Sequence, residues 1–320
     1  MHPLHFSLGF VQFLANHRHP WLTGLFLGAS FIGEAQFYVA LIMLIYVAWD
    51  KHLAVRLSFV VLFAMSANDL LKNLIRNPRP FVRQGTYLDK WAVSRKTAAN
   101  LVTEYSTPSG HAMGAAAFYS YMCVAAKNTW VRVASVLLIL LIGFSRPYLG
   151  VHYGEDVVLG WTVGIVIGVA AAGYAEPMAL RWRRLPYTVQ IATALIAGFA
   201  ASLACIALNR GHIDSQVNGT VAYGGFFFGV VVAAPLEQKR IRFDPRSGGP
   251  AAMILRFAIT LACIVVALLA FKLLLDRYAA SGTVMELVLE HLRYATAGFA
   301  GIFIAPWLFS RAHLVETAPA

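Results

Sequence analysis

The chain has 320 residues, of which 59% are hydrophobic and only 13% are charged. Soluble domains carry about 25% charged residues, so this composition excludes a soluble globular protein and indicates an integral membrane protein. The formal charge of +11 comes from basic residues scattered over short loops, without a separate basic domain interleaved with aromatic residues. Nucleic acid is therefore excluded as the expected partner.

Apolar runs of about 20 residues recur along the chain, and runs of that length predict membrane-spanning helices rather than the shorter strands of a barrel. We expect an all-α, polytopic transmembrane helix bundle of about nine spans. The predicted spans cover residues 25–47, 53–75, 109–126, 130–144, 155–175, 189–208, 219–235, 253–275 and 294–310. Residues 1–24 precede the first span and predict an amphipathic segment at the membrane surface.

The distribution of basic residues predicts the orientation, because cytoplasmic loops carry an excess of lysine and arginine. The loops near residues 51–56, 127–132, 181–184, 239–246 and 311 then share the cytoplasmic side. The loop 76–107 lies on the opposite side although it holds six basic residues. Cations that bind a phosphorylated ligand would account for this departure, so we expect the site to face the periplasm or exterior of a bacterial inner membrane.

The first of three polar patches on that outer side combines Lys72, at the end of the second span, with Arg79 and Pro80. A lysine and an arginine at a membrane boundary are often simple interfacial side chains. The second patch, Pro108–His111, begins the third span. Gly110 there allows close backbone approach, and the free amide groups of a helix amino terminus attract an anion.

The third patch, residues 145–156, contains Arg146, His152 and Asp156. His152 and Asp156 are four positions apart, so on a helix they would share a face. Asp156 could then fix the tautomer of His152 and leave the other ring nitrogen free to attack. The planar guanidinium of Arg146 suits phosphate oxygens. An interfacial salt bridge that caps a transmembrane helix is the structural alternative for this patch taken alone.

Together the patches place three cations and two histidines at one membrane boundary, where charges are costly unless they are paired or functional. A phosphate dianion is a natural partner for Lys72, Arg79 and Arg146. His111 and His152 supply the two roles that in-line phosphoryl transfer requires, an attacking base and a group that protonates the leaving oxygen. Clustered carboxylates for a two-metal site are lacking, so we expect a reaction that needs neither metal nor another cofactor.

These patterns, Lys-x6-Arg-Pro, Pro-Ser-Gly-His and Ser-Arg-x5-His-x3-Asp, resemble the three signature motifs of the type 2 phosphatidic acid phosphatase superfamily. The resemblance implies that His152 is the nucleophile of a phosphohistidine intermediate, that Asp156 orients it, and that His111 is the general acid. It also implies a set of phosphate-binding residues: Lys72, Arg79, Ser109, Gly110 and Arg146. The number of spans is similar to that of the glucose-6-phosphatases and the sphingoid-base phosphate phosphatases.

We therefore expect a catalytic core in residues 25–175 and a transmembrane extension of about four helices in 176–320. The expected activity is metal-independent hydrolysis of a lipid phosphate or diphosphate, an amphiphilic substrate taken from among the membrane lipids. Two alternatives remain open. One is a phosphatase of a soluble ester such as a sugar phosphate, and the other is a lipid phosphotransferase that uses the same residues. Cys123, Cys205 and Cys263 lie in apolar segments and are expected to stay unpaired.

Overall fold

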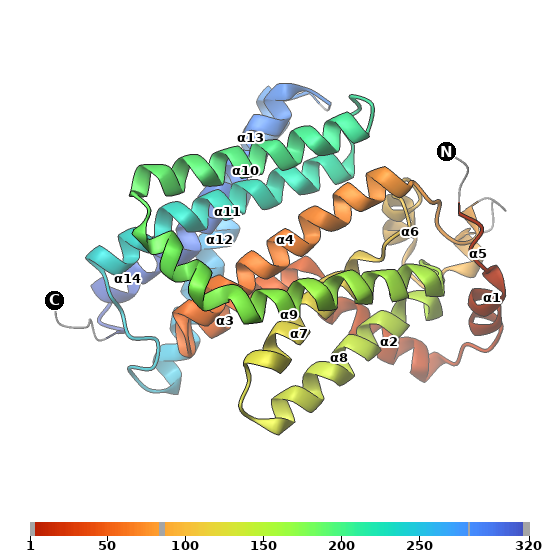
Figure 1. The fold of residues 1–320 in the computed structure, drawn as a ribbon, viewed down its shortest axis with the longest axis horizontal. Helices are drawn as coiled ribbons and strands as arrows, with labels where there is room; N and C mark the ends of the chain where they lie inside the picture. The colour runs from red at the N-terminus through yellow and green to blue at the C-terminus, as the bar shows by residue number, and fades with distance from the viewer. Residues whose placement is uncertain (1–3, 83–86, 281, 316–320) are drawn as a thin grey trace. The chain divides into compact units, whose positions relative to one another are not determined.

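The computed structural model describes residues 4–82, 87–280 and 282–315, and each regular element in these ranges is a helix (Figure 1). The elements are α1 (Leu8–Asn16), α2 (Pro20–Ile32), α3 (Ala35–Ala48), α4 (Lys51–Ile75), α5 (Tyr87–Lys90), α6 (Arg95–Leu101), α7 (Gly110–Ala125), α8 (Thr129–Tyr148), α9 (Gly154–Arg184), α10 (Tyr187–Leu208), α11 (Ser215–Arg240), α12 (Pro250–Tyr278), α13 (Val284–Phe299), the π-helical turn η2 (Ala300–Ile304) and α14 (Ala305–Arg311). The all-α prediction is confirmed. Residues 1–3, 83–86, 281 and 316–320 of the predicted segments lie outside the described residues.

The described residues contain seven helices that are long and apolar enough to cross a membrane, or eight if the bent pair α2–α3 counts as one span. The predicted number of nine is not confirmed. The predicted third span corresponds to α7, which has 16 residues. At 1.5 Å per residue it is about 24 Å long, shorter than the roughly 30 Å hydrocarbon layer.

The predicted first span consists of two helices, α2 and α3, bent by 60°. The break lies at Gly33 and Glu34. A methyl group on Gly33 would lie 2.7 Å from Cγ2 of Ile142 and 3.0 Å from Cδ2 of His111. Only glycine allows this approach, so the break sits directly against α8 and against a predicted site residue.

Two compact units make up the chain: residues 1–38 with 63–176, and residues 39–62 with 177–320. All the predicted site residues lie in the first unit. The predicted division into 1–24, 25–175 and 176–320 follows the motifs and the apolar runs, and it stays a prediction.

In the first unit, α7 is the central helix, and each residue from Ala112 to Tyr121 is buried. Three glycines of α9 at four-residue spacing, Gly160, Gly164 and Gly168, lie against its backbone. A methyl group on Gly164 would lie 2.4 Å from the carbonyl oxygen of Met113. Small residues at this spacing let two membrane helices pack backbone to backbone. The stripe therefore sets the distance between α7 and α9, whose first turns carry His111 and Asp156.

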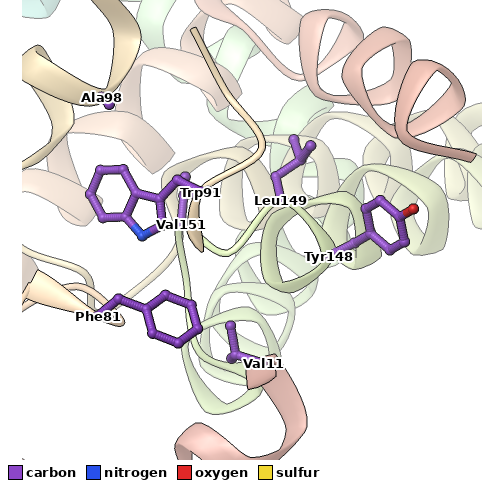
Figure 2. Packing of buried hydrophobic residues seen from close by; sticks show 7 residues of the cluster. All are labelled: Val11, Phe81, Trp91, Ala98, Tyr148, Leu149 and Val151. Atoms are coloured by element: carbon purple, nitrogen blue, oxygen red, sulfur yellow. The ribbon is translucent and has the colours of Figure 1, made fainter. Parts of the chain in front are cut away.

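An apolar cluster of the first unit joins α1, the chain after Pro80, α6 and the loop after α8 (Figure 2). Its buried members are Val11, Phe81, Trp91, Ala98, Tyr148, Leu149 and Val151. The indole Nε1 of Trp91 donates to the carbonyl oxygen of Pro80 across 3.0 Å. The backbone N–H of Ala92 donates to the carbonyl oxygen of Leu149 across 2.9 Å. Through these bonds the cluster holds the first and third motifs together.

The second unit is built around α11, which packs against α10 and α13, while α12 packs against α13. Glycines again permit close approach, since a methyl group on Gly229 would lie 2.1 Å from the carbonyl oxygen of Ala295. Lys51 and the largely buried Glu237 form an ion pair of 3.0 Å in this unit.

Candidate active site

The first motif spans the end of α4 and the turn that follows. Lys72 lies in the last turn of α4, and the chain then leaves the helix at Arg76 with a φ of 55°. Arg79 is only 2% exposed. Its Nη1 donates to the carbonyl oxygen of Val151 across 3.1 Å. The first motif is thus fastened to the third by a predicted phosphate-binding side chain.

The second motif forms the amino terminus of α7. Ser109 is the N-cap residue, and its Oγ accepts a hydrogen bond from the backbone N–H of Ala112. Nδ2 of Asn68 on α4 donates to the carbonyl oxygen of Pro108 across 3.2 Å. A methyl group on Gly110 would lie 3.1 Å from Oδ1 of Asn68, which explains the glycine at this position.

His111 lies in the first turn of α7 and is partly exposed. Its ring edge borders the α2–α3 break at Gly33. The same break borders Ile142, which lies one turn before Arg146 on α8. The predicted general acid therefore lies near the end of α8 that carries Arg146.

Ser145 and Arg146 lie in the last turns of α8, and both are buried. The hydroxyl of Ser145 donates to the carbonyl oxygen of Ile142 across 2.6 Å. Nη1 of Arg146 donates to Oγ of Ser30 on α2. The sequence interpretation did not include Ser30, because an isolated serine in an apolar run carries no motif.

His152 and Asp156 meet as predicted, but not on one helix. His152 lies in the loop before α9, which begins at Gly154, so the expectation of a shared helix face is wrong. The loop turns back at Gly150, where φ is 84°. Nδ1 of His152 then lies 3.3 Å from Oδ2 of Asp156 in the first turn of α9.

Asp156 is fully buried, and donors surround its carboxylate. The backbone N–H of Tyr153 donates to Oδ2 across 2.8 Å. The hydroxyls of Ser106 and Thr107 donate to Oδ2 and Oδ1. Neither hydroxyl was predicted as a site residue, although both directly precede the Pro-Ser-Gly-His motif. With Nδ1 of His152 the carboxylate has four donors, and hydrogen bonds to a carboxylate favour its ionised form.

The contact between Arg79 and His152 determines the tautomer of the histidine. Nη1 of Arg79 lies 2.9 Å from Nε2 of His152. A guanidinium only donates hydrogen bonds, so Nε2 must accept with its lone pair. The ring proton of the neutral imidazole is therefore on Nδ1, which faces Asp156. In this tautomer Nε2 carries the lone pair that the predicted nucleophile needs.

The surroundings of His152 favour its neutral form. The ring is 2% exposed, and this burial is the main cause that lowers the pKa of His152 well below its ordinary value. The neighbouring cations Arg79, Arg146 and Lys72 lower the pKa of His152 further. The lone pair on Nε2 is thus present at neutral pH.

A carboxylate that the sequence interpretation did not assign to the site lies beside two of the cations. Oε2 of Glu104 is 2.8 Å from Nη2 of Arg79 and 3.7 Å from Nζ of Lys72. In the described part of the chain, the buried Nε atoms of Arg79 and Arg146 have no hydrogen-bond acceptor. These two donors leave the site with capacity for an anionic ligand.

The donor set of the site suits an anion better than a metal ion. Within residues 4–82, 87–280 and 282–315, no group of three or more His, Cys, Asp and Glu side chains is placed to hold a metal. The arrangement offers a nucleophilic imidazole, a second imidazole and three cations, which together can carry a phosphoryl group.

Two family models match this chain. Residues 53–178 match the PAP2 superfamily, and residues 221–317 match the family described as PAP2 superfamily phosphatase, transmembrane extension. All the predicted catalytic and phosphate-binding residues fall inside the first match. The second match lies in the part of the chain that the sequence predicts to be a transmembrane extension.

Three similar proteins are phosphatases by name. Phosphatidylglycerophosphatase B of Bacillus subtilis is 28% identical over half of this chain and 78% of its own length. Lipid phosphate phosphatase delta of Arabidopsis thaliana is 26% identical over 46% of this chain and 36% of its own length. Glucose-6-phosphatase 3 of Bos taurus is 28% identical over 47% of each chain. This chain therefore spans less than half of the last two relatives.

This chain aligns with a TM-score of 0.43 to one solved structure, that of the first transmembrane PAP2 type phosphatidylglycerolphosphate phosphatase from Bacillus subtilis. It is 24% identical, and the alignment covers 52% of this chain and 83% of that one.

Proposed function

Because this chain belongs to the PAP2 superfamily, we propose that it is an integral membrane phosphatase that hydrolyses a lipid phosphate or diphosphate through a phosphohistidine on His152. The observation that carries the proposal is the chain of contacts from Asp156 to Nδ1 of His152 and from Nε2 to Arg79. It joins an oriented imidazole, in the tautomer that can attack, directly to a phosphate-binding cation.

In the first step of the proposed reaction, Nε2 of His152 attacks phosphorus and the bond between phosphorus and the leaving oxygen breaks. The electron pair of that bond goes to the leaving oxygen, which takes a proton from His111. Asp156 keeps the proton on Nδ1 and stabilises the positive charge that develops on the ring. Arg79 must leave Nε2 before the attack, and phosphoryl oxygens are its natural new partners.

In the second step, water attacks the phosphohistidine and gives a proton to His111. The bond between phosphorus and nitrogen breaks, its electron pair returns to Nε2, and inorganic phosphate is released. Throughout both steps Lys72, Arg79 and Arg146 neutralise the phosphoryl oxygens. The amide groups at the start of α7, near Ser109 and Gly110, add donors whose dipoles favour negative charge.

A lipid substrate is favoured by two considerations. The Bacillus and Arabidopsis relatives carry lipid phosphatase names. A site at the ends of membrane-spanning helices lets an amphiphile place its head group at the cations while its tail remains in the membrane. The similarity to glucose-6-phosphatase 3 supports a second candidate, hydrolysis of a soluble sugar phosphate. Transfer of the phosphoryl group to an alcohol instead of water would use the same residues.

The test is phosphate release by detergent-purified protein in excess chelator, with His152→Ala as the comparison. The panel contains phosphatidic acid, phosphatidylglycerol phosphate, a polyprenyl diphosphate, a sphingoid-base phosphate and glucose 6-phosphate. We expect the wild-type protein to release phosphate from lipid substrates. His152→Ala and vanadate should each abolish this release. Turnover of glucose 6-phosphate at comparable rates would favour the second candidate. Loss of activity in chelator would contradict the metal-independent mechanism.

We also propose that the site faces the periplasm of a bacterial inner membrane, on the basis of the basic loops assigned to the cytoplasm. The test uses single cysteines in a variant that lacks Cys123, Cys205 and Cys263. An impermeant thiol reagent applied to intact cells should label a cysteine at Asp89, which is exposed on α5. It should not label a cysteine at Arg240, which is exposed at the end of α11. The reverse pattern would place the site in the cytoplasm.

A further inference from the structure

Glu104 lies on a short segment that crosses the candidate site. The segment follows α6 and ends at the start of α7, and the backbone N–H of Ser106 fastens it to the carbonyl oxygen of Asn77 across 2.7 Å. Ser106 and Thr107 of the same segment face Asp156. Glu104 itself contacts Arg79 and Lys72, and its side chain is still 26% exposed.

The carboxylate of Glu104 binds the same groups that the proposed reaction assigns to phosphate. It accepts a hydrogen bond of 2.8 Å from Nη2 of Arg79 and lies 3.7 Å from Nζ of Lys72. A carboxylate and a phosphoryl group take the same kind of charge-assisted hydrogen bond from a guanidinium. Two anions that share these cations also repel each other at short distance. Glu104 and a bound phosphoryl group are therefore in competition.

Arg79 extends this competition to the nucleophile. With Nη2 bound to Glu104, its Nη1 is held on Nε2 of His152 and on the carbonyl oxygen of Val151. When Arg79 is bound to Glu104, it therefore also covers the lone pair on Nε2 of His152. A phosphoryl group that draws Arg79 away from Glu104 also uncovers the nitrogen that attacks it.

We infer, on the basis of the proposed function, that Glu104 is a positioning residue that competes with phosphate for Lys72 and Arg79. When substrate binds, its phosphoryl group displaces the carboxylate and releases Arg79 from His152. After hydrolysis the carboxylate returns to Arg79 and promotes the release of inorganic phosphate. Glu104 therefore lowers the affinity of the site for inorganic phosphate.

The test is the binding of inorganic phosphate and vanadate to Glu104→Gln. The amide keeps the size of the side chain and removes the negative charge. Because the charged carboxylate no longer competes for the cations, the inhibition constants of both anions should fall by about tenfold or more. Direct titration of phosphate into the purified protein by calorimetry measures the same change without turnover. A residue that merely supported the fold would not strengthen anion binding when it is replaced.

Two matched variants complete the experiment. Glu155→Gln is the control that removes a negative charge beside Asp156. The carboxylate of Glu155 accepts a hydrogen bond from the backbone N–H of Ser7, so this variant should leave the inhibition constants unchanged. Glu104→Asp keeps the charge and should remain closer to wild type than Glu104→Gln. Unchanged or weaker phosphate binding by a folded Glu104→Gln protein, judged by thermal unfolding, would overturn the inference. Absence of phosphatase activity in the wild type would instead contradict the proposed function.

Discussion

The backbone N–H of Ser109 donates to the carbonyl oxygen of Asp156 across 3.1 Å, so the second motif is hydrogen-bonded directly to the third. Ser109 begins α7, and Asp156 lies in the first turn of α9. The two helices also approach closely beyond these turns, where Gly160, Gly164 and Gly168 of α9 lie against the backbone of α7. The glycine stripe of α9 provides that approach, and this makes the packing of the helices a determinant of the site.

We expect Gly164→Ala to destabilise the protein by about 1–3 kcal/mol, because the added methyl group must push α9 away from the carbonyl oxygen of Met113. Thermal unfolding in detergent measures the loss, and phosphate release should fall with it. Gly173→Ala is the control, since a methyl group at that position of α9 meets nothing within 4 Å. Equal stability of the two variants would contradict the role assigned to the stripe.

We expect Asp156→Asn to reduce kcat by roughly a thousandfold or more, as in other sites where a carboxylate orients a catalytic imidazole. The amide lacks the negative charge that stabilises the ring of His152. Its NH2 group is itself a donor and would meet the donors that surround this position. Steady-state kinetics on the protein that retains its fold gives the value. Asp89→Asn, at an exposed position on α5, should keep wild-type activity. A loss of less than tenfold in Asp156→Asn would remove Asp156 from the mechanism.

We expect Ser106→Ala and Thr107→Val each to reduce kcat, because each removes a hydroxyl that donates to the buried carboxylate of Asp156. A hydrogen bond to a charged group contributes about 1.5–3 kcal/mol, so each loss should be about tenfold to a hundredfold. Thr103→Ala serves as the control, since this residue is exposed and its hydroxyl donates to the carbonyl oxygen of Asn100. Wild-type rates in both site variants would show that the hydroxyls do not orient Asp156.

The pH dependence of the reaction should reflect the lowered pKa of His152. A base with a lowered pKa stays unprotonated to more acidic pH, so the nucleophile is lost only as the pH falls well below about 6.5. The acid limb of the profile of kcat/KM for the free enzyme should therefore lie well below that value. An acid limb at or above pH 6.5, in protein that thermal unfolding shows to be still folded at that pH, would contradict the assignment.

The sequence by itself determined the class of the protein and predicted the residues of its candidate site. Hydropathy alone indicates a helical membrane protein, because a chain with so few charges and such long apolar runs has no other stable arrangement. The three motifs name residues such as Lys72, His111 and His152, since their chemistry and their order along the chain can be read without a structure.

Only the tertiary structure decided how these residues meet. The tautomer of His152, the ion pair of Glu104 with Arg79, and the bonds of Ser106 and Ser30 to motif residues depend on contacts between segments far apart in the sequence. The structure also gives seven or eight candidate spans among the described residues, where the sequence predicted nine. In a uniformly apolar chain, composition does not distinguish a helix face that meets lipid from one that meets protein, so a short buried helix such as α7 reads as another span.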